Sequence, residues 1–296
     1  MSNKSIKVAL FEGKNANLDS VRGIGFHTSE LLKALQRYKD IKILSEKDGA
    51  DVVHYTKFRP FFVDLPFRKP AKKVVLTIHD LIPLIYTDHY PSGIRGGINF
   101  LINKFLIKKN VDEIITISET SKKDICRFLG VNPKKVHVIY LAPRKIFKKL
   151  DNPSYPNLPK KFALYTGDIN YNKNIPWLID KANELNLPLV IAGKQAKEVE
   201  KMDLDHPELR HLKNIDWSNI IRLGFVPDND LVKIYNLATV YIQPSMYEGF
   251  GLPLLEAVAC GTPVLYNKKC QALVEIMEKR EYSWEKCAKE TLNVYR

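Results

Sequence analysis

Two carboxylates, Glu248 and Glu256, bracket a loop that contains two glycines. A β-rich run at 240–242 precedes the loop, and the apolar stretch after it, with Pro253 near its start, predicts a helix. A glycine loop that leads into a helix directs backbone N–H groups and the positive end of the helix dipole at one place, where a phosphate can bind. The residues of this predicted anion-binding loop are Gly249, Phe250, Gly251 and Leu252.

Each part of this segment also has a purely structural explanation. A carboxylate in the first turns of a helix is favourable without any ligand, and Gly-Phe-Gly is a common turn. The two glutamates are alternatively the acid and the nucleophile of a glycosidase. The phosphate-binding loop between them favours a nucleotide donor instead.

Further candidates follow predicted strands elsewhere in the chain. In an open parallel sheet, ligands bind beyond the carboxyl ends of the strands, so a residue at such a position can meet a substrate. The candidates are Gly23, after the strand predicted over 7–11; His79, after 73–78; Gly167, after 162–166; Lys173, at the mouth of a predicted helix; and Lys194, after 189–193. Two of them have an ordinary alternative, because Gly23 also fits a helix-entry turn and a lone histidine after a strand is more often structural.

These loops belong to a chain in which predicted strands and helices alternate. Such alternation predicts an α/β protein with parallel, doubly wound sheets, and 296 residues suffice for two domains of ordinary size. The segment 151–159 is rich in proline and turn-forming residues and is the expected linker. The predicted domains are therefore 1–150 and a second one beginning at 151.

Composition narrows the class of protein. The chain is 45% hydrophobic, as globular proteins are, and it has no run of about 18 apolar residues that predicts a membrane span. Its N-terminus resembles a first strand more than a signal peptide. The four cysteines are scattered, without a Cys-x-x-Cys pair, which favours reduced thiols in a cytoplasm over a zinc site or disulfides. We therefore expect a cytoplasmic protein.

The positive charge is concentrated in the first half. Residues 1–150 contain 28 Lys and Arg against 14 Asp and Glu, a balance of +14, which leaves 18 and 19 for the remainder. Such a field favours anionic partners: nucleic acid, phospholipid headgroups or a phosphorylated substrate. No nucleic-acid-binding motif accompanies the charge, so we expect no nucleic-acid partner.

Two basic segments of the first half also contain large apolar residues. In 58–69, four phenylalanines alternate with three cations, which fits a loop at a membrane interface or an acceptor groove. The alternative is that these aromatic rings pack on the domain core. The second segment, 94–109, has apolar residues at helical spacing beside lysines, and most such helices cover a sheet.

Taken together, the motif Glu-x7-Glu around Gly-Phe-Gly-Leu-Pro, ending in Ala-Cys-Gly-Thr-Pro-Val, resembles the signature of retaining glycosyltransferase family 4. The run His79-Asp-Leu-Ile-Pro-Leu is similar to the corresponding family segment. The resemblance implies a GT-B fold, with two Rossmann-like domains that face a cleft. It implies an acceptor-side domain at 1–150, a nucleotide-sugar-binding domain at 151–280, and a terminal helix at 281–296 that returns to the first domain.

The resemblance also implies an activity and roles for the candidate residues. The activity is retaining transfer of a hexose, with mannose as the best guess, from a nucleotide-diphosphate sugar to a glycan or a phosphorylated, lipid-linked acceptor. It implies no metal and no resident cofactor, and the basic first domain fits peripheral binding to an anionic membrane. The implied roles are ribose binding for Glu256; sugar contact for Glu248 and His79; sugar and diphosphate contact for the amides of Gly249, Phe250, Gly251 and Leu252; donor binding at Gly167; and diphosphate contact at Gly23 and Lys173, joined by Lys194 only if its side chain turns inward.

The chain departs from the family pattern at two places. Asn172 stands where a family version of the loop has arginine, and Asp168 occupies the other common arginine position, so Lys173 is left as the cation of this loop. Shortly after Asn267 the sequence proceeds almost at once to its last helices, which indicates an internal deletion and a shortened second domain. These departures favour an alternative function: a degenerate relative that binds nucleotide or glycan without turnover.

Overall fold

The computed structural model describes residues 5–12, 24–279 and 281–296. The described residues form two compact units: unit 1, from 5–12, 24–87, 92–142 and 281–296, and unit 2, from 88–91 and 143–279. The chain thus passes from unit 1 to unit 2 at 142/143, eight residues before the boundary expected at 150. Each unit is built on one parallel sheet.

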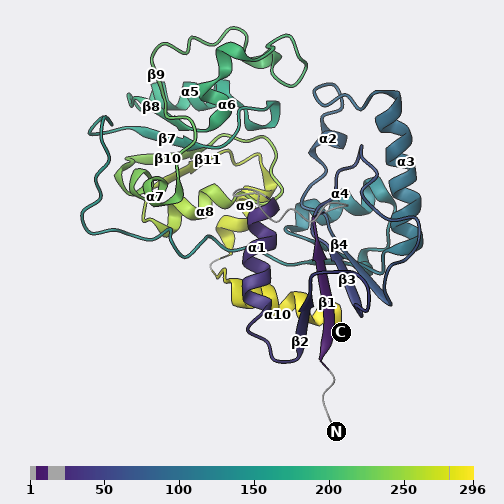
Figure 1. The fold of residues 1–296 in the computed structure, drawn as a ribbon. Helices are drawn as coiled ribbons and strands as arrows, with labels where there is room; N and C mark the ends of the chain where they lie inside the picture. The colour runs from purple at the N-terminus through teal and green to yellow at the C-terminus, as the bar shows by residue number, and fades with distance from the viewer. Residues whose placement is uncertain (1–4, 13–23, 280) are drawn as a thin grey trace. The chain divides into compact units, whose positions relative to one another are not determined.

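The sheet of unit 1 has six parallel strands in the order β2-β1-β3-β4-β5-β6 (Figure 1). The strands are β1 (Ile6–Phe11), β2 (Ile41–Leu44), β3 (Val52–Tyr55), β4 (Lys73–Thr77), β5 (Glu113–Thr116) and β6 (Val136–Val138). The central strands β3 and β4 are buried almost throughout, as expected for parallel strands that are covered on both faces. The short edge strand β2 lies outside the predicted strands.

Helices connect these strands and close the unit. They are α1 (Ile24–Leu35), α2 (Ile82–Ile85), α3 (Gly93–Asn110), α4 (Glu119–Leu129), the short 3₁₀ helix η1 (Pro133–Lys135) and α10 (Trp284–Tyr295). Helix α4 shows how local sequence sets its ends. The Ser118 hydroxyl accepts a hydrogen bond from the Ser121 amide at its start, and Gly130, with φ of 64°, ends it in the left-handed region.

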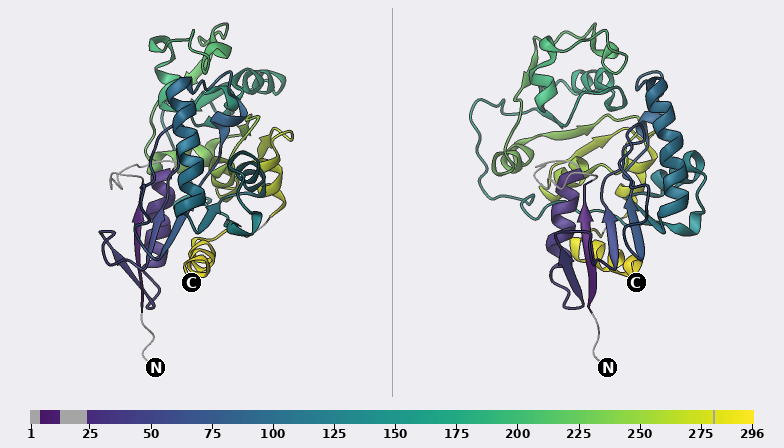
Figure 2. Two further views of the ribbon diagram at one scale, coloured as in Figure 1. Left: turned by 90° about the vertical axis from the view of Figure 1, so that its right-hand side faces the viewer. Right: turned by 45° about the vertical axis from the view of Figure 1, so that its right-hand side comes forward.

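The C-terminal helix α10 packs beside α1 within unit 1 (Figure 2). A buried histidine on β3 fixes it to the sheet. His54 Nδ1 lies 2.7 Å from the Tyr295 hydroxyl, and His54 Nε2 lies 2.7 Å from the Thr77 hydroxyl. Burial lowers the pKa of His54 to about 3, so this histidine is neutral and joins helix and sheet by hydrogen bonds alone.

Unit 2 has five parallel strands in the order β11-β10-β7-β8-β9. They are β7 (Ala163–Thr166), β8 (Leu189–Ala192), β9 (Ile220–Arg222), β10 (Val240–Gln243) and β11 (Val264–Tyr266). The helices are α5 (Ile175–Glu184), α6 (Lys194–Lys197), α7 (Asp228–Leu237), α8 (Leu252–Ala259) and α9 (Gln271–Glu278), with short 3₁₀ helices η2 (Tyr171–Lys173), η3 (Val199–Lys201) and η4 (Arg210–Leu212). The two parallel α/β sheets confirm the predicted fold class, whereas the deletion near Asn267 stays a prediction.

Within the described residues, no helix combines the length and the apolar character needed to cross a membrane. All four cysteines are free thiols, and three of them are buried.

Candidate functional site

The predicted anion-binding loop lies at the carboxyl end of β10 and leads into α8. Gly251 precedes the first helical residue and has φ of 114°, a conformation that glycine adopts without strain. A Cβ atom at this position would lie 2.6 Å from the Leu273 side chain, so α9 also leaves no space for one. In the first turn of α8, Pro253 has no N–H group and the Leu254 amide donates to the Gly251 carbonyl oxygen at 3.0 Å, so Leu252 supplies the amide at the helix start that can contact a phosphate. The loop therefore has the backbone geometry of a phosphate site.

Glu248 is buried just before this loop and accepts three hydrogen bonds. Its Oε1 accepts from the Ser245 hydroxyl at 2.6 Å, from the Gln243 side-chain amide at 2.9 Å and from the Lys173 ammonium at 2.7 Å. Gln243 and Ser245 were not among the predicted site residues, although Gln243 is the last residue of β10 and Ser245 follows it closely. Three donors fix the carboxylate in one orientation beside the glycine loop.

Lys173 ends the 3₁₀ helix η2, and Asn174 after it adopts the left-handed conformation with φ of 53°. This turn directs the lysine side chain to Glu248, so the structure joins two predicted site residues in one ion pair. A bound diphosphate would compete with Glu248 for the same ammonium group. The pair can thus hold the lysine in position until an anion arrives.

Glu256 is buried in α8. Its nearest cation is Arg144, whose guanidinium lies 3.4 Å from Glu256 Oε1 and also pairs with Asp228. Burial raises the pKa of Glu256 to about 7, although Arg144 acts in the opposite direction. The carboxyl group therefore titrates near neutral pH, and it would gain from the hydroxyl donors of a ribose. Sequence reasoning missed Arg144, which lies in the connection before the predicted linker.

A row of buried hydrogen-bonding side chains lies between Glu248 and Glu256. The Thr166 hydroxyl stands at its centre, 2.7 Å from the Tyr235 hydroxyl and 3.5 Å from the Tyr241 hydroxyl. The members in order from Glu248 are Gln243, Tyr241, Thr166 and Tyr235, which donates to Glu256. Burial raises the pKa of both tyrosines, so they stay neutral hydroxyl groups. The Thr166 hydroxyl has one proton and can donate to only one of the two tyrosines at a time.

Gly167 and Gly193 meet at the carboxyl ends of β7 and β8. Gly167 has φ of 142°, and a Cβ atom on Gly193 would lie 2.1 Å from the Gly167 carbonyl oxygen. The loops after β7 and β8 can therefore lie this close together only because residue 193 is glycine. The next residue, Lys194, begins the short helix α6 and is exposed; it takes part in none of the described hydrogen bonds of Glu248 or Glu256.

Asn172 does not face an anion site. It is buried, its side-chain oxygen accepts a hydrogen bond of 2.7 Å from the Tyr90 hydroxyl, and its amide donates to the Tyr247 carbonyl oxygen at 3.1 Å. These bonds attach the segment 88–91 and the loop before Glu248 to η2. Asn172 thus has a structural role in unit 2, and Lys173 is the cation that η2 directs to the motif.

In unit 1, His79 follows β4 and pairs with His27 of α1. His27 Nδ1 lies 2.9 Å from His79 Nε2, so one ring nitrogen donates and the other accepts. Burial lowers the pKa of His79 to about 4 and that of His27 well below its usual value. Trp284 stacks on His27, with centroids 6.1 Å apart. His79 Nδ1 is buried and has no hydrogen-bond partner among the described residues.

Sequence reasoning missed His27, although it lies in the helix that follows the glycine turn. The predicted residue of that turn, Gly23, lies outside the described residues.

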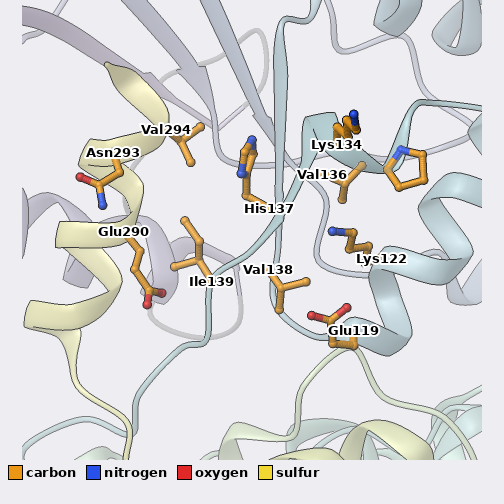
Figure 3. Close-up of a pocket in the computed structure, with 11 residues that line it drawn as sticks. Glu119, Lys122, Lys134, Val136, His137, Val138, Ile139, Glu290, Asn293 and Val294 are labelled. Atoms are coloured by element: carbon orange, nitrogen blue, oxygen red, sulfur yellow. The ribbon is translucent and has the colours of Figure 1, made fainter.

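A separate cavity of about 480 Å³ opens between β6, α4 and α10 of unit 1 (Figure 3). Its lining mixes charges of both signs, and Figure 3 shows His137 and Lys122 on one side and Glu290 on α10 on the other. His137 pairs with Glu113 at 2.7 Å. None of the predicted site residues lines this cavity. Among the described residues, no group of three His, Cys, Asp or Glu side chains is arranged to hold a metal ion.

Comparison with known proteins supplies the family. Residues 10–142 match the family described as Glycosyltransferase Family 4, and residues 147–292 match Glycosyl transferases group 1. The chain is 30% identical over 253 residues to the serotype-specific mannosyltransferase WbdA of Escherichia coli, covering 79% of this chain but only 30% of WbdA. It is 25% identical over 283 residues to the O-antigen chain mannosyltransferase B of Escherichia coli, covering 78% of this chain and 72% of that protein.

The fold has known relatives as well. The structure of HepE from Anabaena in complex with UDP and glucose matches with a TM-score of 0.60 and 14% identity, covering 98% of this chain and 92% of HepE. That likeness establishes the two-domain GT-B architecture, and the two family matches together extend over most of the chain. The chain therefore belongs to the GT-B glycosyltransferases.

Proposed function

We propose that this protein transfers a hexose, with mannose as the first candidate, from a nucleotide-diphosphate sugar to a glycan or a phosphorylated, lipid-linked acceptor. The observation that carries the proposal is the Lys173–Glu248 pair beside the glycine loop before α8. A cation and a carboxylate beside a glycine loop support the proposal, because a diphosphate leaving group attached to a sugar needs positive charge and hydrogen-bonding groups.

Each group has a separate task in the proposed reaction. The acceptor hydroxyl oxygen forms a bond to the anomeric carbon while the bond from that carbon to the diphosphate oxygen breaks. Negative charge then grows on the diphosphate, where Lys173 and the amides of the loop 249–252 stabilise it. Charge stabilisation is assigned to these protein groups, and the proposal includes no metal ion and no resident cofactor.

Retention of configuration is part of the proposal. If the acceptor attacks on the side of the leaving group, its proton passes to a phosphate oxygen of the departing diphosphate. No side-chain base is then required. Glu248 would contact the transferred sugar, Glu256 would accept hydrogen bonds from the ribose hydroxyls, and His79 would contribute a ring nitrogen to the sugar.

The choice of mannose rests on relatives. WbdA and the O-antigen chain mannosyltransferase B are both described as mannosyltransferases. This chain spans only about 30% of the length of WbdA, so we do not assign all the substrates of WbdA to this protein. Nucleotide-diphosphate mannose is the first donor to test, with uridine diphosphate glucose as the comparison.

A second candidate function is binding of nucleotide or glycan without turnover. The observation that favours it is Asn172, which is buried in structural hydrogen bonds where the family pattern has a cation. A site with one cation in place of two stabilises a leaving diphosphate less well.

Release of nucleotide from a panel of nucleotide-diphosphate sugars tests the two functions, with and without lipid extracts as acceptor. We expect release from at least one donor by the wild type and its loss in Glu248→Ala. Glu184→Ala is the matched control, because Glu184 is exposed on α5 and pairs only with Lys181 among the described ion pairs. Binding of nucleotide without release from any donor would support the second function and overturn the first.

A further inference from the structure

Helix α3 of unit 1 exposes its large apolar side chains. Ile94, Ile98, Leu101 and Phe105 are 54% to 87% exposed. Their spacing of four, three and four residues places them in one stripe along the helix. The helix does not simply cover the sheet with this stripe, as a basic apolar helix would be expected to do. Figure 2 shows α3 in its left view as a long helix of unit 1.

The other face of α3 carries asparagines, which are used to hold a neighbouring loop. Asn103 donates to the carbonyl oxygens of Pro60 and Phe62 at 3.0 and 2.8 Å, and Asn99 donates to that of Phe61 at 3.0 Å. Asn110 makes the same kind of bond, at 2.8 Å, to Pro66. Asn103 and Asn110 thus face inward beside the buried Leu106 and Ile107, while the apolar stripe of the same helix faces outward.

The loop held by these asparagines adds two exposed rings, Phe62 and Phe67. Its conformation is fixed by Arg59, which donates two hydrogen bonds to Asp64 at 2.6 and 2.9 Å and lies over the Phe62 ring. We call the exposed apolar side chains of helix and loop the α3 surface: Phe62, Phe67, Ile94, Ile98, Leu101 and Phe105. They are six of the nine large apolar side chains exposed among the described residues, so the exposure is concentrated here.

The charges around the α3 surface are positive. Helix α3 contains Arg95 and three lysines but no acidic residue. The ammonium groups of Lys104 and Lys109 lie 5.7 and 5.6 Å from the rings of Phe100 and Phe105, so their stems run along apolar surface. The neighbouring acid Asp112 is already paired with Lys69 at 2.7 Å. A second copy of this surface would bring like charges together, whereas an anionic surface would complement it.

We propose that the α3 surface docks the protein on an anionic phospholipid membrane. The apolar side chains enter the boundary between headgroups and acyl chains, and the cations of α3 contact lipid phosphates. The inference deepens the proposed function, because such docking would bring the enzyme to a lipid-linked acceptor. Its binding step requires neither donor nor turnover.

Co-sedimentation with vesicles of phosphatidylcholine, with and without phosphatidylglycerol, tests the docking. We expect the wild type to bind vesicles that contain phosphatidylglycerol at low salt and to dissociate as salt is raised. The double variant Ile98→Asp/Phe105→Asp should bind at least about tenfold more weakly, because it removes apolar area and adds two negative charges. Both side chains are exposed, and an unchanged circular dichroism spectrum and unfolding midpoint verify the fold.

The matched control is Leu185→Asp, an exposed leucine of unit 2, which should bind vesicles as the wild type does. Equal binding to neutral vesicles, equal loss in the control, or no loss in the double variant would each overturn the proposal. A concentration-dependent dimer that the double variant abolishes, without vesicle binding by the wild type, would assign the surface to a second copy instead.

Nucleotide release from the soluble donor, measured on the same samples, separates this inference from the proposed function. Vesicle binding without nucleotide release from any donor would support the docking proposal and contradict the proposed transfer reaction. Nucleotide release without vesicle binding would support the transfer reaction and contradict the docking proposal.

Discussion

The Lys173 ammonium lies 2.7 Å from Oε1 of Glu248, so the two residues expected to contact diphosphate and sugar neutralise each other in this structure. The lysine side chain is mostly buried and Glu248 more so, which makes the interaction less screened than a surface ion pair. An arriving diphosphate must therefore exchange one strong partner of Lys173 for another. This exchange gives the pair a testable role in donor binding and turnover.

Lys173→Met should lower the rate of nucleotide release by roughly 10²- to 10³-fold, because it removes the cation that faces the leaving diphosphate. The fold should survive, since Glu248 keeps its hydrogen bonds from Gln243 and Ser245. Steady-state rates and thermal unfolding of both proteins measure the two effects. Lys181→Met is the control, because that lysine forms an exposed pair on α5. Equal activity of the two variants would remove Lys173 from the reaction.

The pKa of Glu256, raised to about 7 by burial, predicts how stability changes with pH. The unfolded chain has the ordinary pKa of 4.5, so between pH 4.5 and 7 the folded state binds more protons than the unfolded state. Stability contributed by the neutral carboxyl is therefore present at low pH and is lost as pH rises through this window. The loss has an upper limit of roughly 3 kcal/mol.

Glu256→Gln removes this titration. We compare the free energy of unfolding of the variant with that of the wild type at each pH. The difference should favour the variant more at pH 8 than at pH 5, as measured by urea unfolding at both values. Glu184→Gln, at an exposed position, should show no such change. The same stability difference between wild type and Glu256→Gln at the two pH values would contradict the raised pKa.

The motif segment was predictable because its information is local. Glycines, a proline and an apolar run within 240–263 specify a strand, a loop and a helix, and the observed β10 and α8 follow that order. Arg144 and His27 were not predictable, because their partners Glu256 and His79 lie 112 and 52 positions away in the sequence. Only the packing of the strands brings these side chains together.

Helix α3 shows a different limit. The apolar spacing in 94–109 correctly indicates a helix. The same periodicity defines two faces of this helix but does not show which face is buried. Asparagine usually faces solvent, so the sequence pattern predicts that Asn103 points outward and Phe105 points inward. The observed orientation is the opposite, because the carbonyl groups of 60–66 offer the asparagines hydrogen bonds that are available only in the folded unit.

The His27–His79 pair predicts that a residue without direct substrate contact affects turnover. If His27 sets the tautomer of His79, His27→Leu should reduce the turnover number about tenfold with little change in KM. His27→Asn keeps a hydrogen-bonding atom near Nδ1 and should restore part of the loss. Steady-state kinetics of both variants, each with an unfolding curve, provide the test. Equal rates in the two variants would mean that His27 serves packing alone.

Gly193 predicts a purely steric effect. A Cβ atom there would lie 2.1 Å from the Gly167 carbonyl oxygen, and that atom belongs to backbone that cannot rotate away. Gly193→Ala should therefore destabilise the protein by roughly 2 to 4 kcal/mol and weaken donor binding, because the loops after β7 and β8 must separate. Urea unfolding and titration with nucleotide measure both effects.

The matched control is Gly97→Ala, in the interior of α3, where an added Cβ meets nothing within 4 Å. Alanine loses less backbone entropy than glycine in a helix, so this substitution should stabilise the protein by about 0.5 to 1 kcal/mol. The same chemical change thus acts with opposite signs at the two positions. If both variants were stabilised, the loops after β7 and β8 would have room to separate without cost, and the close approach of Gly167 and Gly193 would not constrain the site.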